Sequence, residues 1–228
     1  MNDILIQARG LCVSYRNGRE RINVLRDLSL ELRRGEAVAI IGPSGSGKST
    51  LLNLLNGLLQ ADSGSLRVLD RDAAGLAEND WARLRRTRIA TLFQDGNLVP
   101  TLTVERNIAF RAGLAGLQRH TGQALLERLG IADIARRYPD QVSGGQRQRA
   151  ALACAFAMEP EIILADEPTG SLDQATARRV TPLFFDAIRE RALGALIVTH
   201  NTELARRCDR VLELRQGALE PWDSALSS

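Results

Sequence analysis

The sequence predicts an α/β fold: a core with a mainly parallel β-sheet, a small N-terminal antiparallel β-subdomain and an inserted helical subdomain. Apolar runs typical of buried strands recur at 37–41, 161–165 and 195–199, and helical stretches separate them. A series of helical segments between Pro100 and Met158 interrupts this alternation. We therefore expect one domain over 1–228, with the core and β-subdomain at 1–95 and 159–220, the helical subdomain at 96–158 and a tail at 221–228.

Strands dominate the N-terminal third of the chain. Two segments rich in strand-forming residues flank Asn17-Gly18, a typical hairpin turn, and predict an antiparallel pair. A buried strand then leads into a glycine-rich loop, and the apolar run after the loop predicts a helix. The elements expected here are strands at 4–15, 24–32, 37–41 and 65–69, and a helix from the loop to residue 59.

Helices and short buried strands alternate over the rest of the chain. A break at 138–140 separates several short helical segments from a long helix, whose small apolar residues at 150–157 predict packing on several sides. A closing hairpin is expected around Gln216-Gly217. The expected helices are 81–86, 104–115, 122–129, 131–136, 146–158, 176–191 (despite Pro182) and 203–208, and the expected strands are 89–93, 161–165, 195–199, 210–214 and 218–219.

Composition and charge argue against several classes of protein. The net charge is +3 and no basic run stands out beyond 83–88, so nucleic acid is not an expected partner. Three widely spaced cysteines outside any CxxC pair argue against a zinc site or a disulfide framework, and fit a reducing compartment. No stretch approaches the roughly 18 consecutive apolar residues of a membrane span. If the protein works at a membrane, we expect another chain to supply the spans.

The stretch GPSGSGKST at 42–50 predicts a phosphate-binding loop, since it follows a buried strand and opens a helix. Its glycines let backbone N–H groups turn toward a phosphate chain, and the helix N-terminus adds the positive end of its dipole. Lys48 can reach the β- and γ-phosphates of a nucleoside triphosphate, and Ser49 can bind Mg²⁺. The alternative is an ordinary glycine turn. The residues predicted to surround the phosphates are Gly42, Pro43, Ser44, Gly45, Ser46, Gly47, Lys48, Ser49 and Thr50.

Polar residues follow three further strands, at the edge where a parallel sheet carries its ligands. Asp166 can hold Mg²⁺, and the adjacent Glu167 can polarise an attacking water. Gln94 can contact Mg²⁺ and that water, and His200 can hydrogen-bond the γ-phosphate. The alternatives are an exposed acidic turn, a surface glutamine and a structural histidine, and the last is the role expected for His120.

A second bare helix N-terminus is expected at Ser143-Gly144-Gly145-Gln146. Ser143 is a good N-cap, and the two glycines leave the first turn of the helix open, which again suits a phosphate. An ordinary capped helix start is the alternative. A chain with two bare, glycine-lined helix N-termini but only one nucleotide-binding loop suggests that the second terminus has a separate use. Composition does not identify the phosphate that this second terminus binds.

Taken in order, GPSGSGKST, Gln94, VSGGQRQR at 142–149, ILADEPTGSLD at 163–173 and His200 resemble the motifs of the ATP-binding-cassette (ABC) ATPases. The resemblance extends over 4–219 and implies a RecA-like P-loop NTPase core. It also implies ATP hydrolysis with Mg²⁺, in a homodimer whose two copies close head to tail over two ATP molecules.

The resemblance further implies a role for each matching residue. Tyr15 would stack on adenine, Gln94 would sense the γ-phosphate and a transmembrane partner, and Glu167 would be the general base. Lys48, Gln94 and His200 would share in catalysis, and Ser49, Gln94 and Asp166 would hold Mg²⁺. The remaining nucleotide contacts would come from the signature residues Ser143, Gly144, Gly145 and Gln146, which meet the ATP held by the other copy, and from Asp173 at the dimer interface.

DEPTGSLD, YPDQVSGGQ and FQDGNLVPTLTVERNI resemble the group that serves lipoprotein release, macrolide or peptide export, and cell division. This implies a peripheral subunit on the cytoplasmic face of the inner (plasma) membrane, driving separate transmembrane subunits. A polar-solute importer and a soluble non-transport ATPase remain the alternatives. No long coiled coil and no second cassette occur, which disfavours the nucleic-acid and ribosome-associated classes. The motifs identify neither the cargo nor the effect of Cys154, where many relatives carry Arg.

Overall fold

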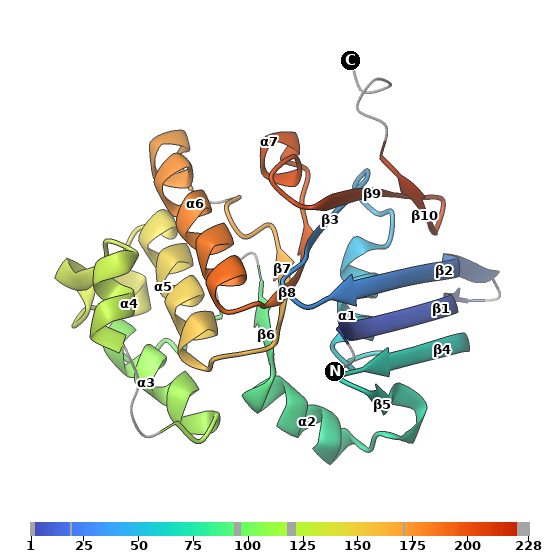
Figure 1. The fold of residues 1–228 in the computed structure, drawn as a ribbon, viewed down its shortest axis with the longest axis horizontal. Helices are drawn as coiled ribbons and strands as arrows, with labels where there is room; N and C mark the ends of the chain where they lie inside the picture. Colours follow the sequence, from blue (N-terminus) through green and yellow to red (C-terminus); the bar gives the residue numbers. More distant parts are fainter. Residues whose placement is uncertain (1–2, 19, 94–96, 118–121, 171, 223–228) are drawn as a thin grey trace. The chain divides into compact units, whose positions relative to one another are not determined.

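The computed structural model describes residues 3–18, 20–93, 97–117, 122–170 and 172–222 (Figure 1). The chain divides into two compact units. The first comprises Met1–Trp81 and Gly194–Ser228, and the second comprises Ala82–Leu193. The helical segments expected at 96–158 belong to the second unit, whereas the predicted boundaries of core and helical subdomain stay a prediction.

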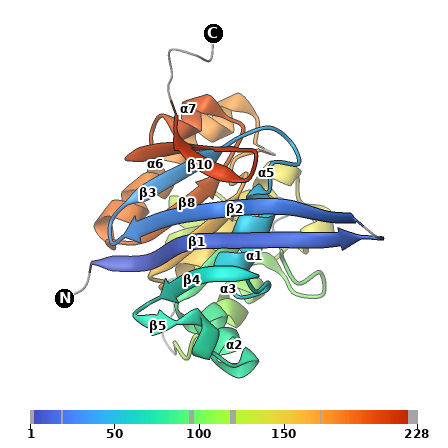
Figure 2. The same cartoon turned by 90° about the vertical axis from the view of Figure 1, so that its right-hand side faces the viewer.

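An antiparallel sheet in the first unit confirms the β-subdomain predicted near the N-terminus. β1 (Ile4–Asn17) and β2 (Glu20–Arg33) are long strands that pair across the expected turn, with Asn17 opposite Glu20 (Figure 2). β4 (Ser63–Val68) pairs with β1 and with β5 (Arg71–Asp72), which gives the strand order β2-β1-β4-β5. Leu28, Leu30 and Leu32 of β2 are buried, because alternate residues of a strand point to the same face.

The parallel strands of the first unit carry the glycine-rich loop. β3 (Ala37–Ile41) lies between β8 (Gly194–Val198) and β9 (Arg210–Arg215) and is parallel to both. β10 (Ala218–Pro221) returns along β9 as the predicted hairpin. Every residue of β3 and β8 is buried, which explains why both read as continuous apolar runs. Helix α7 (Thr202–Ala205) follows β8, and a 3₁₀ turn (Ala73–Gly75) follows β5.

Helix α1 (Lys48–Leu55) follows the loop and ends earlier than the predicted residue 59. Gly57 has a φ of 66°, in the left-handed region, which stops the helix. A Cβ on Gly57 would lie 2.0 Å from Cδ2 of Trp81, so the indole packs directly on the glycine backbone. A tertiary contact therefore accompanies the end of this helix, and the continuing apolar residues Leu58 and Leu59 do not extend it.

Parallel strands and long helices make up most of the second unit. β6 (Ile89–Leu92) pairs in parallel with β7 (Ile162–Asp166). Helices α3 (Val104–Leu114), α4 (Gly122–Arg128) and α6 (Gln174–Glu190) all pack against α5 (Gly144–Ala157). Residues 150–157 of α5 are all buried, which confirms the predicted packing on several sides. Helix α2 (Glu78–Thr87) runs from one unit into the other along the chain.

The segment at 131–136 is shorter than predicted, since it forms only a 3₁₀ turn (Ala132–Ile134). The carbonyl oxygens of Ala135 and Arg137 accept hydrogen bonds from N–H groups in the first turn of α3, at 2.9 Å each, so they do not extend a local helix. A second 3₁₀ turn (Pro139–Gln141) leads to α5. None of the helices formed by the described residues is long and apolar enough to cross a membrane.

Candidate nucleotide site

At two positions of the loop at 42–50, the neighbouring strands leave space only for glycine. Gly47, with a φ of 104°, precedes α1, and a Cβ on it would lie 2.9 Å from Cγ1 of Val24. A Cβ on Gly42 would lie 2.5 Å from the carbonyl oxygen of Leu214. Such distances leave no room for a side chain. The neighbouring strands β2 and β9 therefore hold the loop closely from two sides.

Polar groups of the loop are arranged to meet an anion. Lys48 Nζ donates to the carbonyl oxygens of Gly42 and Pro43, at 2.8 Å each, which keeps the ammonium over the loop. No described side chain caps the N-terminus of α1, so its first N–H groups face the loop. The buried Ser46 hydroxyl has no hydrogen-bond partner among the described residues. A cation, helix N–H groups and an unsatisfied hydroxyl together fit a phosphate chain.

The structure places His200 at the same sheet edge as this loop. β3 and β8 are parallel with Ile40 opposite Val198, so the residues that follow each strand emerge side by side. Thr199 N donates to Ile40 O at 3.1 Å, and the Thr199 hydroxyl accepts from Asn201 N at 3.0 Å. His200 lies between these anchored residues and is exposed. Its side chain is therefore presented near the end of β3, where the phosphate-binding loop begins.

Tyr15 belongs to an exposed apolar pair on the antiparallel sheet. It lies opposite Ile22 in the register of β1 and β2, and the two residues are 43% and 47% exposed. Directly opposite residues of an antiparallel pair point to the same face. Ile22 also shares a face of β2 with Val24, the residue that contacts Gly47 in the loop. The pair thus offers a flat apolar surface beside the loop, suitable for an aromatic base.

The acidic pair follows β7 in the second unit. Asp166 is the last residue of the strand and is half-buried, and Glu167 is buried. Glu167 has a φ of 49°, which costs about 1–2 kcal/mol for a residue other than glycine. Its carbonyl oxygen accepts from Gln148 Nε2 at 2.8 Å and from Gly170 N at 3.0 Å. These two bonds fix the turn that presents the Glu167 side chain.

Ser143 caps α5, as predicted. Its hydroxyl accepts from Gln146 N at 3.2 Å, and Gln146 Oε1 accepts from Ser143 N at 3.0 Å, so the two residues form a reciprocal capping box. Ser143 and Gly144 are exposed, and a Cβ on Gly144 would meet no atom within 4 Å. The helix start is therefore both rigid and open to a ligand.

Asp173 caps the next helix, α6. Its carboxylate accepts from Thr176 N at 2.9 Å. Hydrogen bonds from Thr176, through its side chain first and then its backbone, lower the pKa of the Asp173 carboxyl below the ordinary value. The carboxylate thus stays charged over the physiological range and stabilises the start of α6.

A family model described as "ABC transporter" matches residues 25–170. The chain belongs to the ABC transporter family. The lipoprotein-releasing system ATP-binding protein LolD of Novosphingobium aromaticivorans is 42% identical over 224 residues, 96% of this chain and 100% of that protein. The macrolide export ATP-binding/permease protein MacB of Escherichia coli (strain K12) is 42% identical over 219 residues, 94% of this chain and 34% of MacB. The chain thus spans about a third of MacB.

Solved structures of an ABC cassette share the fold. A dimeric post-hydrolysis state of the ATP-binding cassette MJ0796, bound to ADP and Pi, has a TM-score of 0.87 at 32% identity and covers 94% of this chain and 96% of its own. A second dimeric structure of the cassette has a TM-score of 0.86 at 34% identity over the same shares. These matches confirm the predicted P-loop NTPase core and identify the chain as a nucleotide-binding ABC ATPase that serves a transporter.

The predicted site residues of this ABC ATPase fall into two groups. Tyr15, the loop at 42–50 and His200 lie in the first unit, whereas Asp166 and Glu167 lie in the second unit with the signature residues and Asp173. Gln94 and His120 lie outside the described residues, so their predicted roles stay predictions.

Two buried polar residues of the ABC ATPase, Gln148 and Asn107, are not among the residues predicted from the sequence to have a role. Gln148 is part of the VSGGQRQR motif and lies between Arg147 and Arg149, before the apolar run at 150–157, so no local pattern marks it as buried. Asn107 interrupts the apolar pattern of α3. Cys154 is buried in α5, so the departure from the usual Arg lies between helices and not at the surface.

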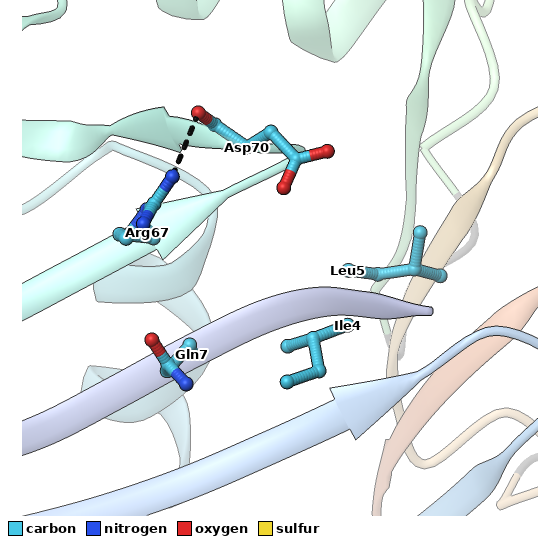
Figure 3. A pocket seen from close by; sticks show the side chains of 5 residues that line it. All are labelled: Ile4, Leu5, Gln7, Arg67 and Asp70. Carbon is cyan, nitrogen blue, oxygen red and sulfur yellow. Dashed lines mark hydrogen bonds between the residues drawn. The ribbon is translucent and has the colours of Figure 1, made fainter. Parts of the chain in front are cut away.

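A small hollow in the first unit lies away from these residues. Ile4, Leu5 and Gln7 of β1 line it together with Arg67 and Asp70, and Arg67 Nη2 donates to Asp70 O at 3.3 Å (Figure 3). It is formed at the start of β1 and the end of β4. None of the predicted nucleotide-binding residues contributes to it.

Proposed function

We propose that this ABC ATPase drives lipoprotein release, export or related mechanical work by separate transmembrane subunits. The match to LolD carries the proposal, because it extends over the whole length of that ATP-binding protein. MacB, a macrolide export protein, supports the same group. The subunit then works as a peripheral protein on the cytoplasmic face of the inner membrane. A polar-solute importer is the competing candidate, and these relatives favour release and export over it.

Each working site is composed of two copies of the chain arranged head to tail. The loop at 42–50 of one copy binds the triphosphate, and Ser143, Gly144, Gly145 and Gln146 of the other copy contact the same nucleotide. The open, rigid start of α5 supports this arrangement, since helix N–H groups there favour an anion. The dimeric MJ0796 structures support it independently. Asp173 lies at the interface between the copies.

In this site, the base and the phosphates are bound by different side chains. Tyr15 stacks on adenine with Ile22 beside it. Lys48 exchanges its bonds to the loop carbonyls for bonds to the β- and γ-phosphates, which are stronger because both partners are charged. His200 donates a hydrogen bond to the γ-phosphate from the end of β8.

Hydrolysis requires a base and a metal ion. Glu167 accepts the proton of the attacking water, and Gln94 orients that water. Ser49, Gln94 and Asp166 would hold Mg²⁺, since hydroxyl, amide and carboxylate oxygens are the ligands it prefers. When bound, Mg²⁺ neutralises charge on the β- and γ-phosphates.

ATP-dependent dimerisation tests the composite site. Glu167→Gln should retain ATP binding and slow hydrolysis about 10²–10⁴-fold, so ATP-bound dimers accumulate and are resolved by gel filtration. Adding Ser143→Arg places a long cation at the start of α5 and should prevent the dimer, with MANT-ATP binding by the monomer unchanged. Ala124→Arg adds the same side chain at an exposed position of α4 and serves as the control. Dimers that survive Ser143→Arg would contradict the head-to-tail site.

Identification of the membrane partner tests the biological role. The tagged Glu167→Gln chain is purified from host membranes with ATP, and co-purifying proteins are identified by mass spectrometry. A partner with four spans and a large extracytoplasmic domain supports release or export. A partner with five or six spans accompanied by a solute-binding protein would indicate import instead.

A further inference from the structure

Gln148 is a buried polar residue of α5, just before the buried apolar run at 150–157. It is only 4% exposed, and all residues from Ala150 to Ala157 are buried. A buried amide is costly unless it is hydrogen-bonded, so its bonds indicate what it does. Its Nε2 donates to the carbonyl oxygen of Glu167 at 2.8 Å.

This hydrogen bond acts on the turn that presents the predicted base. Glu167 has a left-handed backbone with a φ of 49°, and its carbonyl also accepts from Gly170 N at 3.0 Å. The direction of the Cα–Cβ bond depends on the backbone of that turn. A donor that fixes the carbonyl therefore fixes where the carboxylate points, without contacting the reacting atoms.

The same hydrogen bond joins two functional parts of the chain. Gln148 lies in α5 and Ser143 is the N-cap of the same helix, held rigidly by the capping box. A rise of about 1.5 Å per residue places the two less than two turns apart. A shift of the helix start is therefore carried directly to Gln148 and through it to Glu167.

We propose that Gln148 is a positioning residue that orients Glu167 and couples it to the signature helix. In the composite site, Ser143 meets the ATP held by the other copy, whereas Glu167 acts on the ATP held by its own chain. Gln148 thus links the two sites of the dimer within one polypeptide. The inference rests on the proposed role of Glu167 as the base.

The decisive variant is Gln148→Met, which removes the donor and keeps a side chain of similar length. We expect kcat to fall about ten- to hundredfold, because small displacements of a reacting group have effects of this size. KM for ATP and the Kd of MANT-ATP should stay within twofold. Amide hydrogen exchange at 167–170, measured by mass spectrometry, should become faster. Gln148→Glu keeps the size of the side chain and puts an acceptor oxygen in place of the Nε2 donor. It replaces Gln148→Met if circular dichroism shows that the Met variant does not fold.

A double variant separates positioning from general damage. In the Glu167→Gln background, Gln148→Met should cause no further loss in single-turnover hydrolysis, since the group it orients is already removed. Cys154→Ala is the matched control, because it truncates another buried side chain of α5. It should lower the thermal midpoint and leave kcat and exchange at 167–170 unchanged.

Three results would overturn the coupling: an unchanged kcat in Gln148→Met, losses that multiply in the double variant, or the same kcat loss in Cys154→Ala. A failure of the proposed function looks different. If Glu167→Gln hydrolyses ATP at the normal rate, the assignment of the base is wrong. In that case the exchange experiment still reports whether Gln148 holds the turn.

Discussion

The side chain of Asn107 hydrogen-bonds both backbone groups of Val99. Its Oδ1 accepts from Val99 N at 2.7 Å, and its Nδ2 donates to Val99 O at 3.1 Å. The same Nδ2 lies 3.0 Å from Leu102 O and 3.1 Å from Thr103 O. Asn107 is only 2% exposed. It therefore fastens the loop at 99–103 to the first turn of α3.

Asn107→Leu should destabilise the protein by about 3 kcal/mol. The substitution leaves partly buried backbone groups of the loop without their side-chain partner, and each such loss costs about 1–3 kcal/mol when the group is shielded from water. Urea denaturation followed by circular dichroism measures the effect. Arg106→Leu is the control, since it makes the same residue at an exposed neighbouring position. Equal midpoints for the two variants would show that the Asn107 bonds contribute little.

ATP should protect Lys48 from reductive methylation. Lys48 is the only lysine of the chain, so the N-terminal amine provides an internal reference in the same molecule. At ATP concentrations about ten times the Kd, methylation of Lys48 should slow about tenfold, because only the unbound fraction reacts. Peptide mass spectrometry measures both amines. Adenosine, which lacks phosphates, should protect neither the Lys48 amine nor the N-terminal amine. Protection of Lys48 by adenosine equal to that by ATP would place Lys48 away from the phosphates.

Tyr15→Ala should weaken binding of ATP and ADP by the same factor, about tenfold, because stacking of a base on an aromatic ring is worth about 1–3 kcal/mol. Binding of inorganic tripolyphosphate should be unchanged, since it has no base. Isothermal titration calorimetry distinguishes the three ligands, and Tyr15→Phe should retain the wild-type affinity. A loss of tripolyphosphate binding in Tyr15→Ala would indicate damage to the loop instead of loss of stacking.

Iodoacetamide at pH 8 should modify Cys12 well before Cys154 and Cys208. Burial raises the pKa of the Cys154 thiol to about 12, and burial together with Asp209 raises the pKa of the Cys208 thiol to about 12. Only the thiolate reacts, and at pH 8 about one such thiol in ten thousand is ionised. Reaction at both sites should rise with pH and become complete in urea. Labelling of native Cys154 as fast as Cys12 would contradict the burial.

Local patterns were sufficient for the elements that carry the motifs. The buried strands at 37–41 and 195–199 read as continuous apolar runs because both faces of a parallel sheet are covered. The loop at 42–50 and the cap at Ser143 have short-range requirements, a glycine backbone and a hydroxyl beside helix N–H groups, so their residue types reveal them.

Other features depended on partners far away in the chain. α1 was predicted too long because the apolar pattern continues past Gly57, where Trp81 packs on the backbone. The helix predicted at 131–136 is only a short turn because the carbonyl oxygens of Ala135 and Arg137 accept hydrogen bonds from α3. No local pattern contains these contacts.

The sequence by itself determined the family, the phosphate-binding loop, the signature helix and the identity of the candidate catalytic residues, because each depends on residue types at fixed short spacings. Only the tertiary structure decided how Lys48 is held over its loop, that Tyr15 faces outward with Ile22, and that Gln148 holds the carbonyl of Glu167. Those relationships arise when separate strands and helices pack, and the partners of a buried polar group are chosen at that stage.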